Sequence, residues 1–341
     1  MENQLKDIIL FAKFTFHLSC LEPISEELTK LGIENSLITQ RHVVYDSFNE
    51  RKKKFKVIII ADEYFNLFRD CAEVMVGTGH SLVSKNTTFS SRNNDADYLC
   101  VASNWQKNEF INRGIYPRKE FWITGYPAAD NLFKKNISSY KNIIFFPTNG
   151  KKNILIAPTY NRDLNLMDSF IRSEQVVSEL VNKFNLIFKP HPVLPKKYPD
   201  QMEFMKHLSN KYENVNYVED SHSNISDYIL LSDMFLGDCS GAMILALAGN
   251  KPIIAYNNPN RLSSPYYDKN GLEWTMRKDF AHEIEDISEL LNTLEYGIFY
   301  TKDISDPLAY ERTKVKNLIF GDFQDGESSK RIAEKIRRII T

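Results

Sequence analysis

Short apolar runs alternate along the chain with longer segments in which apolar residues recur at helical spacing. Runs rich in Ile, Val, Leu and Phe indicate strands buried on both faces, and the spaced segments indicate helices that cover them. We predict strands at residues 8–14, 34–39, 57–60, 73–76, 97–101, 120–124, 154–157, 186–188, 215–218, 234–236 and 252–256. We predict helices at residues 23–31, 64–70, 103–113, 174–183, 201–211, 242–248, 284–294 and 328–340.

Strands that alternate with helices at this spacing predict parallel, doubly wound sheets. The pattern is interrupted at residues 134–152, which are rich in Lys, Asn and Ser, and then starts again. A chain of 341 residues is long enough for two domains. We therefore predict an α/β protein with two Rossmann-like domains, at 1–145 and 151–325, whose sheets face an interdomain cleft. A basic C-terminal helix follows at 326–341.

The segment 225–259 contains a clear βαβ unit, with the turn Gly-Asp-Cys-Ser-Gly at 237–241 between its strand and its helix. Such a turn lies at the carboxyl edge of a parallel sheet, where ligands bind. Ser240 or Asp238 can cap the helix, and the remaining N–H groups with the helix dipole can hold phosphate. Gly241 has no Cβ, which lets an anion approach. A capped structural turn explains the same residues, so the other motifs at this edge decide between the two interpretations.

Two further motifs follow predicted strands in the second half. In Lys-Pro-His-Pro (189–192), the prolines favour extended backbone, so that Lys189 and His191 point the same way and can converge on a phosphate. A rigid surface turn is the alternative. In Pro-Thr-Tyr-Asn-Arg (158–162), Thr159 and Arg162 can contact phosphate.

In the first half, Gly-Thr-Gly-His-Ser (77–81) directly follows a predicted strand. His80 is the natural candidate for deprotonating a hydroxyl, because histidine titrates near neutrality. Lys85 could support phosphate or a developing charge. A lone loop histidine is the alternative. Asp95-Ala-Asp97 has the form of a metal-binding D-x-D motif, but Asp97 begins a strand, and we interpret the pair as structural.

Composition and charge further narrow the possible classes of function. The net charge of −1 gives no general attraction to nucleic acid. The four cysteines are scattered, which is typical of reduced thiols in a cytosol. No stretch is long and apolar enough to span a membrane. No cluster has metal-ligand spacing, and dinucleotide, P-loop and α/β-hydrolase patterns are absent, so we predict neither metal nor cofactor.

Together these motifs resemble the CDP-glycerol glycerophosphotransferases of the teichoic-acid primase and polymerase type, which have the GT-B fold. The resemblance covers residues 70–340 and lies in the order of six motifs, at 77–85, 125–130, 157–162, 189–192, 232–241 and 325–332. Gly-Tyr-Pro-Ala-Ala-Asp (125–130) has Ala128 where the family has arginine. Ser81 replaces the glycine that follows the family's first histidine, and Gly241 replaces a serine.

The resemblance implies transfer of a glycerol-phosphate or related polyol-phosphate group from a CDP-activated donor to a hydroxyl of a surface polymer or lipid-linked acceptor, with release of CMP. It implies that His80 is the general base and that His191, the second catalytic histidine, contacts the donor pyrophosphate together with Ser240. The first domain would hold the acceptor through Gly79, Ser81, Lys85 and Asp130. The second would hold the donor through Lys189, Thr159, Arg162, Asp238, Ser240 and Gly241.

Three alternatives remain open: a GT-B glycosyltransferase for capsule or lipopolysaccharide that uses a nucleotide sugar, a UDP-GlcNAc 2-epimerase-like enzyme, and a non-catalytic nucleotide-binding partner. We expect a cytoplasmic protein. The helix at 328–340 carries basic residues on one side and Ile332, Ile336 and Ile339 on another. We predict that it packs back on the body, with peripheral contact to anionic lipid on the inner membrane face as the alternative.

Overall fold

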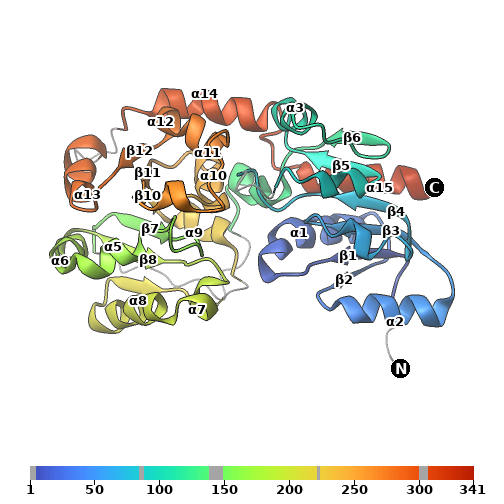
Figure 1. Cartoon of the computed structure of the whole chain (residues 1–341), viewed down its shortest axis with the longest axis horizontal. Helices are drawn as coiled ribbons and strands as arrows, with labels where there is room; N and C mark the ends of the chain where they lie inside the picture. Colours follow the sequence, from blue (N-terminus) through green and yellow to red (C-terminus); the bar gives the residue numbers. More distant parts are fainter. Residues whose placement is uncertain (1–4, 84–87, 138–148, 221–222, 299–305) are drawn as a thin grey trace. The chain divides into compact units, whose positions relative to one another are not determined.

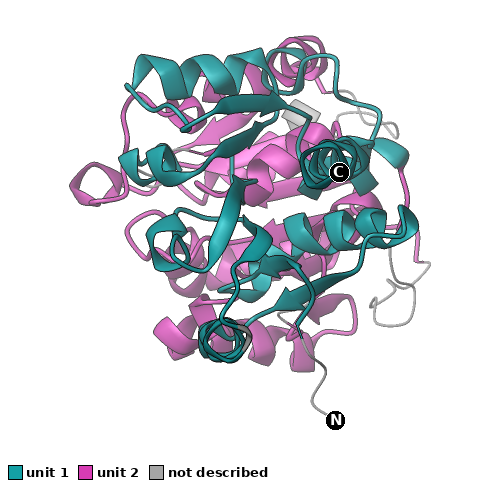
Figure 2. Cartoon of the chain, turned by 90° about the vertical axis from the view of Figure 1, so that its right-hand side faces the viewer, with its two compact units in different colours: residues 1–82, 86–134, 317–341 teal, residues 83–85, 135–316 magenta. Residues whose placement is uncertain are grey.

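The computed structural model describes the chain except for residues 1–4, 84–87, 138–148, 221–222 and 299–305. The chain forms two compact units (Figure 2): unit 1 contains residues 1–82, 86–134 and 317–341, and unit 2 contains residues 83–85 and 135–316. Each unit is built on one parallel sheet, which confirms the predicted α/β class. The predicted end of the first domain, at residue 145, lies outside the described residues.

The sheet of unit 1 has the strand order β2-β1-β3-β4-β5-β6 (Figure 1). Its strands are β1 (Ile8–Phe11), β2 (Asn35–Ile38), β3 (Phe55–Ile60), β4 (Ala72–Gly77), β5 (Tyr98–Val101) and β6 (Glu120–Ile123). Strand β2 lies on one side of β1, and the next strand in the chain, β3, lies on the other. The direction of winding therefore reverses between β1 and β3, and open α/β sheets bind ligands at such a point.

Helices cover the sheet of unit 1. They are α1 (Leu18–Lys30), α2 (Arg41–Arg51), α3 (Asn104–Asn112), α4 (Asp130–Lys134) and α15 (Ser328–Ile340). Helix α14 (Ala309–Phe320) starts in unit 2 and ends in unit 1. The chain thus returns to unit 1 at residue 317, so residues 317–325, expected in the second domain, belong to unit 1, as does the C-terminal helix.

The sheet of unit 2 has the order β12-β11-β10-β7-β8-β9. Its strands are β7 (Asn153–Ala157), β8 (Asn185–Phe188), β9 (Val215–Tyr217), β10 (Met234–Gly237), β11 (Ile253–Tyr256) and β12 (His282–Ile284). The chain adds β8 and β9 on one side of β7 and then β10 to β12 on the other. The winding reverses between β7 and β10, so the expected ligand position of unit 2 lies at the carboxyl ends of these strands.

The helices of unit 2 are mostly short. They are α5 (Met167–Arg172), α6 (Glu174–Lys183), α7 (Leu194–Lys197), α8 (Pro199–Lys211), α9 (Ile225–Leu231), α10 (Gly241–Ala248), α11 (Leu272–Thr275), α12 (Arg277–Phe280) and α13 (Glu289–Asn292). The predicted βαβ unit is present as β10-α10-β11. Helix α10 is buried along almost its whole length, as its apolar sequence indicates.

Two predicted helices are placed differently in the structure, and several helices, among them α2, α5, α9 and α14, were not predicted. The first helix begins at Leu18 and keeps Pro23 in its interior, because Cys20 and Leu21 add buried surface before the proline. Helix α2 was missed, since it has little amphipathic pattern and buries only Val44 of the side chains described. The helix predicted at 284–294 was placed too early: Ile284 ends strand β12 and pairs with β11, and α13 begins later.

The last helix, α15, packs against α1, and Ile332 and Ile336 are fully buried. This confirms the predicted packing against the body. Its N-terminus is held by Asp130, whose carboxylate accepts hydrogen bonds from the backbone N–H groups of Ser328 (3.0 Å) and Ser329 (2.9 Å). Two predicted motifs far apart in sequence, 125–130 and 325–332, thus form one structural joint. Among the described residues, no helix has the length and apolarity needed to cross a lipid bilayer.

Candidate active site

The carboxyl edge of unit 2 brings the turns after β7 and β10 together. Thr159 follows β7, and its backbone N–H donates to both carboxylate oxygens of Asp238, at 3.1 and 3.2 Å. Asp238 is fully buried. A buried carboxylate repels a phosphate, so this geometry supports a role for Asp238 in joining the two turns. Thr159 is also fully buried, and its backbone is held in the joint.

Ser240 stands at the N-terminus of α10 in extended backbone geometry. Its side chain makes no capping bond, and the buried hydroxyl has no hydrogen-bond partner within the described part of the chain. The first-turn N–H groups of a helix also lack intrahelical partners. Gly241 is the first residue of α10 and carries no side chain over them. Ser240 Oγ and the helix end therefore offer donors to an anion.

Arg277 lies at the start of α12 and was not identified in the sequence. The guanidinium is fully buried and donates from Nη2 to the backbone carbonyl of Asp238 at 2.7 Å. Its Nε is 3.9 Å from a carboxylate oxygen of Glu283. Burial lowers the pKa of Arg277, but an arginine stays charged in proteins. The result is a fixed positive charge at the turn that carries Ser240, and it favours an anion there. No local motif marks Arg277.

His191 lies beyond the end of β8, and its Nδ1 accepts a hydrogen bond from the backbone N–H of Val193 at 3.2 Å. In the neutral ring, the proton must therefore sit on Nε2. The ring is partly exposed and packs 4.8 Å from that of Tyr160, centroid to centroid. His191 thus presents an Nε2–H donor, which is suited to a phosphate oxygen.

The two predicted phosphate cations of unit 2 are engaged with protein groups. Lys189 is buried and donates to the backbone carbonyl of Asp220 at 2.9 Å. Burial lowers its pKa to about 8. Arg162 makes a bidentate pair with Asp168, at 2.7 and 2.9 Å, and a bond of 2.6 Å to Asp200. The structure therefore does not bring the Arg162 charge to Ser240 as a free cation.

In unit 1, loops after three adjacent strands bring His17, Asp62 and His80 together at the reversal point of the sheet. His17 follows β1, Asp62 follows β3, and His80 follows β4. The distance from His17 Nε2 to Asp62 Oδ2 is 3.5 Å, and that from His80 Nδ1 to Asp62 Oδ1 is 3.9 Å. The two imidazole centroids are 4.9 Å apart. His80 was selected in the sequence because its loop directly follows a strand. The same criterion, applied to the residues that follow β1 and β3, would have indicated His17 and Asp62.

The hydrogen bonds of His80 define its tautomer. Its Nδ1 lies 3.1 Å from the carbonyl oxygen of Ala61, which can only accept, so Nδ1 carries the proton. Nε2 is then the basic nitrogen. The hydroxyl of Tyr126 donates to the backbone carbonyl of His80 at 2.7 Å and so holds the loop in place. His80 is partly exposed, with 26% of its side-chain surface accessible, so a substrate hydroxyl can reach it.

The remaining predicted residues of unit 1 have different surroundings. Gly79 has a positive φ of +64°, a conformation that favours glycine, and it sets the turn before His80. Ser81 is buried. Asp130 is the cap of α15 described above, which gives its carboxylate a structural use. Lys85 lies outside the described residues. Asp97 accepts from Met75 N–H and pairs with Arg69, which supports the predicted structural role for this member of the D-x-D motif.

His17 is the least expected member of the unit 1 site. It is fully buried, and neither ring nitrogen has a hydrogen-bond partner among the described residues. Burial lowers its pKa to about 2, and the nearby His80 and Lys13 add to the shift. The ring of His17 is therefore neutral at physiological pH.

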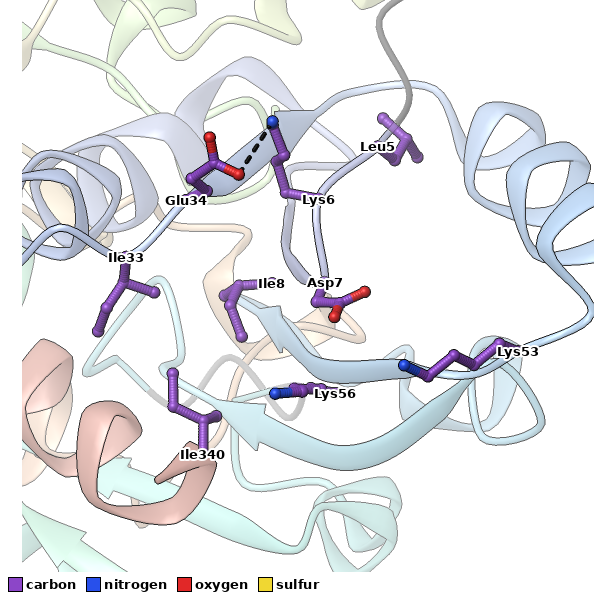
Figure 3. Close-up of a pocket in the computed structure, with 9 residues that line it drawn as sticks. All are labelled: Leu5, Lys6, Asp7, Ile8, Ile33, Glu34, Lys53, Lys56 and Ile340. Atoms are coloured by element: carbon purple, nitrogen blue, oxygen red, sulfur yellow. Dashed lines mark hydrogen bonds and ion pairs between the residues drawn. The ribbon is translucent and has the colours of Figure 1, made fainter.

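A hollow of about 680 Å³ lies elsewhere on unit 1 (Figure 3). It is lined by residues at the amino ends of the strands, including Asp7 and Ile8 at the start of β1, and by Ile340 of α15. Lys6 and Glu34 form an exposed ion pair of 3.0 Å at its rim. Because ligands of parallel sheets bind at the carboxyl edge, we do not assign the reaction to this hollow.

The chain is similar to known proteins in sequence and in fold. A model of the family described as CDP-glycerol:poly(glycerophosphate) glycerophosphotransferase matches residues 69–338. The structure of the wall teichoic acid polymerase TagF has a TM-score of 0.68 at 15% identity, over 100% of this chain and 90% of that one. S. aureus MnaA, in a co-structure with UDP, has a TM-score of 0.64 at 12% identity, over 98% and 97% of the two chains.

The UDP-GlcNAc 2-epimerase of Methanocaldococcus jannaschii, in complex with UDP-GlcNAc and UDP, has a TM-score of 0.61 at 15% identity, over 97% and 99%. No curated protein matches the chain. Identities this low show the fold alone, and they confirm the GT-B type. Since polymerase and epimerase share that fold, the family match over residues 69–338 is what favours the transferase interpretation.

Proposed function

Because the chain belongs to the CDP-glycerol:poly(glycerophosphate) glycerophosphotransferase family, we propose that it transfers a glycerol-phosphate or related polyol-phosphate group from a CDP-activated donor. The acceptor is a hydroxyl of a surface polymer or of a lipid-linked precursor, and CMP is released. We assign donor binding to unit 2 and activation of the acceptor hydroxyl to unit 1. The chemistry of the named side chains supports this assignment.

Unit 2 supplies hydrogen-bond donors for the pyrophosphate. Ser240 Oγ has no hydrogen-bond partner among the described residues. The first N–H groups of α10 and the Nε2–H of His191 are donors of the kind that a phosphate oxygen accepts from. Arg277 adds a buried positive charge at the same turn. Phosphoryl transfer needs positioning and charge neutralisation more than covalent chemistry, so these groups suit the reaction.

Unit 1 supplies the base. The acceptor O–H gives its proton to His80 Nε2, and the oxygen forms a bond to the β-phosphorus, which carries the polyol. The bond from that phosphorus to the bridging oxygen breaks, and its electron pair leaves with CMP. A positioned base of this kind contributes about 10²- to 10⁴-fold to a rate. The acceptor roles of Gly79, Ser81 and Lys85 remain part of this proposal, whereas the placement of Asp130 supports a structural function.

The proposal rests on the opposite hydrogen-bonding patterns of His80 and His191. Ala61 accepts from His80 Nδ1, which leaves Nε2 as a base, and Val193 donates to His191 Nδ1, which leaves Nε2–H as a donor. One imidazole is thereby set to take a proton and the other to bind an anion. A chain that bound nucleotides without catalysis would not require the first arrangement.

Nucleotide release from a donor panel tests the proposal. The panel is CDP-glycerol, CDP-ribitol, CMP-sugars, UDP-sugars and GDP-sugars, each with a crude membrane fraction as acceptor. We expect CMP from CDP-glycerol or CDP-ribitol, and at least a 100-fold lower turnover in His80→Ala with donor affinity retained. Release of UDP or GDP, or of CMP from a CMP-sugar only, would instead establish a nucleotide-sugar transferase on the same fold.

We also propose that the exposed basic residues of α15 attract an anionic membrane surface that holds the acceptor. Arg337 and Arg338 are exposed, whereas the apolar face of the helix is already buried in unit 1. The attraction would therefore be electrostatic, at about 1 kcal/mol per basic residue. Flotation with anionic vesicles should fall when both arginines are changed to glutamate. Equal flotation of the wild type and this variant would remove the idea.

A further inference from the structure

His17 has no role in the proposed reaction, yet its surroundings need an explanation. Its imidazole is fully buried, and both nitrogens lack a hydrogen-bond partner among the described residues. A buried polar group without a partner destabilises a fold, and each such group in a protein calls for a reason. Phenylalanine would pack against the rings of Phe14 and Phe16 without this cost. The ring of His17 therefore has a lone pair that is available to a ligand.

The atoms around that lone pair form a ligand set. One side-chain atom each from His17, Asp62 and His80 can be chosen so that all three lie within 4.8 Å of one another. Ligands of a tetrahedral zinc ion, bound at 2.0–2.2 Å, lie about 3.4 Å apart. His17 Nε2 lies 3.5 Å from Asp62 Oδ2, close to that value, and His80 Nδ1 lies 3.9 Å from the other carboxylate oxygen, Oδ1. Small side-chain rotations would bring the set to bonding distance.

Neighbouring groups hold the three side chains in place. The backbone N–H of Glu63 donates to Asp62 Oδ1 at 2.8 Å. The ring of Phe16 packs against both His17 and His80, with centroids 4.7 and 5.2 Å away. An apolar wall of this kind limits solvent access to a bound ion and strengthens its attraction to a carboxylate. Asp62 and His80 are partly exposed and give the ion a path from solvent.

We propose that His17, Asp62 and His80 form a binding site for a divalent transition-metal ion of the zinc class. Two imidazoles and one carboxylate are a known zinc ligand set that leaves a position for water or another ligand. Imidazole nitrogens disfavour Mg²⁺ and Ca²⁺, which prefer oxygen ligands. The nearby cation, Lys13, is held with its ammonium 3.6 Å from the centroid of the Tyr64 ring, and it lowers the affinity of the site.

One consequence rests on the proposed function. A metal bound to His80 Nδ1 replaces the bond to Ala61, and the proton of the neutral ring moves to Nε2. His80 then has no lone pair for the acceptor hydroxyl. Bound metal therefore inhibits transfer, and the site makes the enzyme sensitive to free zinc.

Metal binding to the full-length chain, measured without any substrate, tests the site itself. After treatment with EDTA and desalting, the protein is titrated with Zn²⁺ in competition with a chromophoric chelator, and with Co²⁺ by its visible spectrum. We expect one ion per chain with a micromolar or lower Kd. We expect at least tenfold weaker binding in His17→Phe and in Asp62→Asn, and tighter binding in Lys13→Ala. The exposed His207 of unit 2 provides a matched control, and His207→Ala should bind as the wild type does.

Binding that is absent, or that is unchanged in both His17→Phe and Asp62→Asn, would overturn the site. If His17→Phe fails to fold, as judged by circular dichroism, Asp62→Asn gives the answer, because Asp62 lies closer to solvent. CMP release with and without Zn²⁺ separates the two proposals. Binding in a chain without transferase activity leaves the site and removes the function. Activity that zinc does not inhibit, in a chain that binds zinc, removes only the inhibition.

Discussion

Replacing Ser240 by alanine should weaken donor binding and strengthen the fold at the same time. A hydrogen bond to a charged group contributes about 1.5–3 kcal/mol. If Ser240 Oγ donates to the pyrophosphate, its loss should raise the Kd for CDP-glycerol about 10- to 150-fold. The rest of the donor site, including the N–H groups of α10, stays in place in this variant.

The effect on stability has the opposite sign. The Ser240 residue is 6% exposed, and its hydroxyl has no partner among the described residues. A buried hydroxyl without a hydrogen bond costs about 1–3 kcal/mol. The usual loss of about 1 kcal/mol at a helix N-cap does not apply, because the side chain makes no capping bond. We expect the free energy of unfolding of unit 2 to rise by about 1 kcal/mol, and its thermal transition by about 2–4 °C.

Differential scanning calorimetry and donor titration calorimetry measure the two effects. Ser232→Ala is the matched control, since Ser232 is also buried in unit 2 but donates to the carbonyl of Ile229 at 3.0 Å. It should lower stability by about 0.5–1.5 kcal/mol and leave donor affinity unchanged. If Ser240→Ala behaves like Ser232→Ala, the Ser240 hydroxyl serves the fold, and the assignment of the phosphate site is refuted.

Three further predictions concern other parts of the chain. His191→Asn keeps an acceptor for the Val193 N–H group but loses the Nε2–H donor, so kcat/KM for CMP release should fall about 10- to 100-fold. His191→Gln should recover part of this kcat/KM. Equal kcat/KM values in the two variants would contradict the assigned tautomer. Asp130→Ala should lower the free energy of unfolding by about 2–4 kcal/mol and speed hydrogen exchange in α15, with donor affinity unchanged. If exchange in α15 stays as slow in this variant as in the wild type, Asp130 does not hold the helix. Burial lowers the pKa of Lys189 from 10.5 to about 8, so between these pH values the unfolded chain binds more protons, and the free energy of unfolding rises with pH. Urea unfolding from pH 8 to 10 should show this rise in the wild type and not in Lys189→Met, and identical slopes would show that Lys189 is not the cause.

The local features of the chain determined much of the fold. Strands such as β1 and β10 are apolar and buried at every position. Helices such as α6 and α15 follow from the spacing of apolar residues and from end residues only a few positions away. The weak pattern of α2 gave no such signal, and the strand at His282–Ile284 is too short and too polar to separate from the helix after it. Local patterning is reliable where one element buries a continuous apolar surface by itself.

Part of the candidate site could likewise be predicted from local sequence, and part could not. The sequence alone indicated His80, His191 and Ser240, because each follows a strand and the carboxyl edge of a parallel sheet collects such turns. Only the tertiary structure decided which turns meet. It placed Asp62 beside His17 and His80, tied Arg162 to Asp168, and used Asp130 to hold α15. The contacts of Asp62 and of Asp130 join residues far apart in the chain. They depend on strand order and helix packing, which are set by burial over a whole unit and leave no periodic trace in the sequence around each residue.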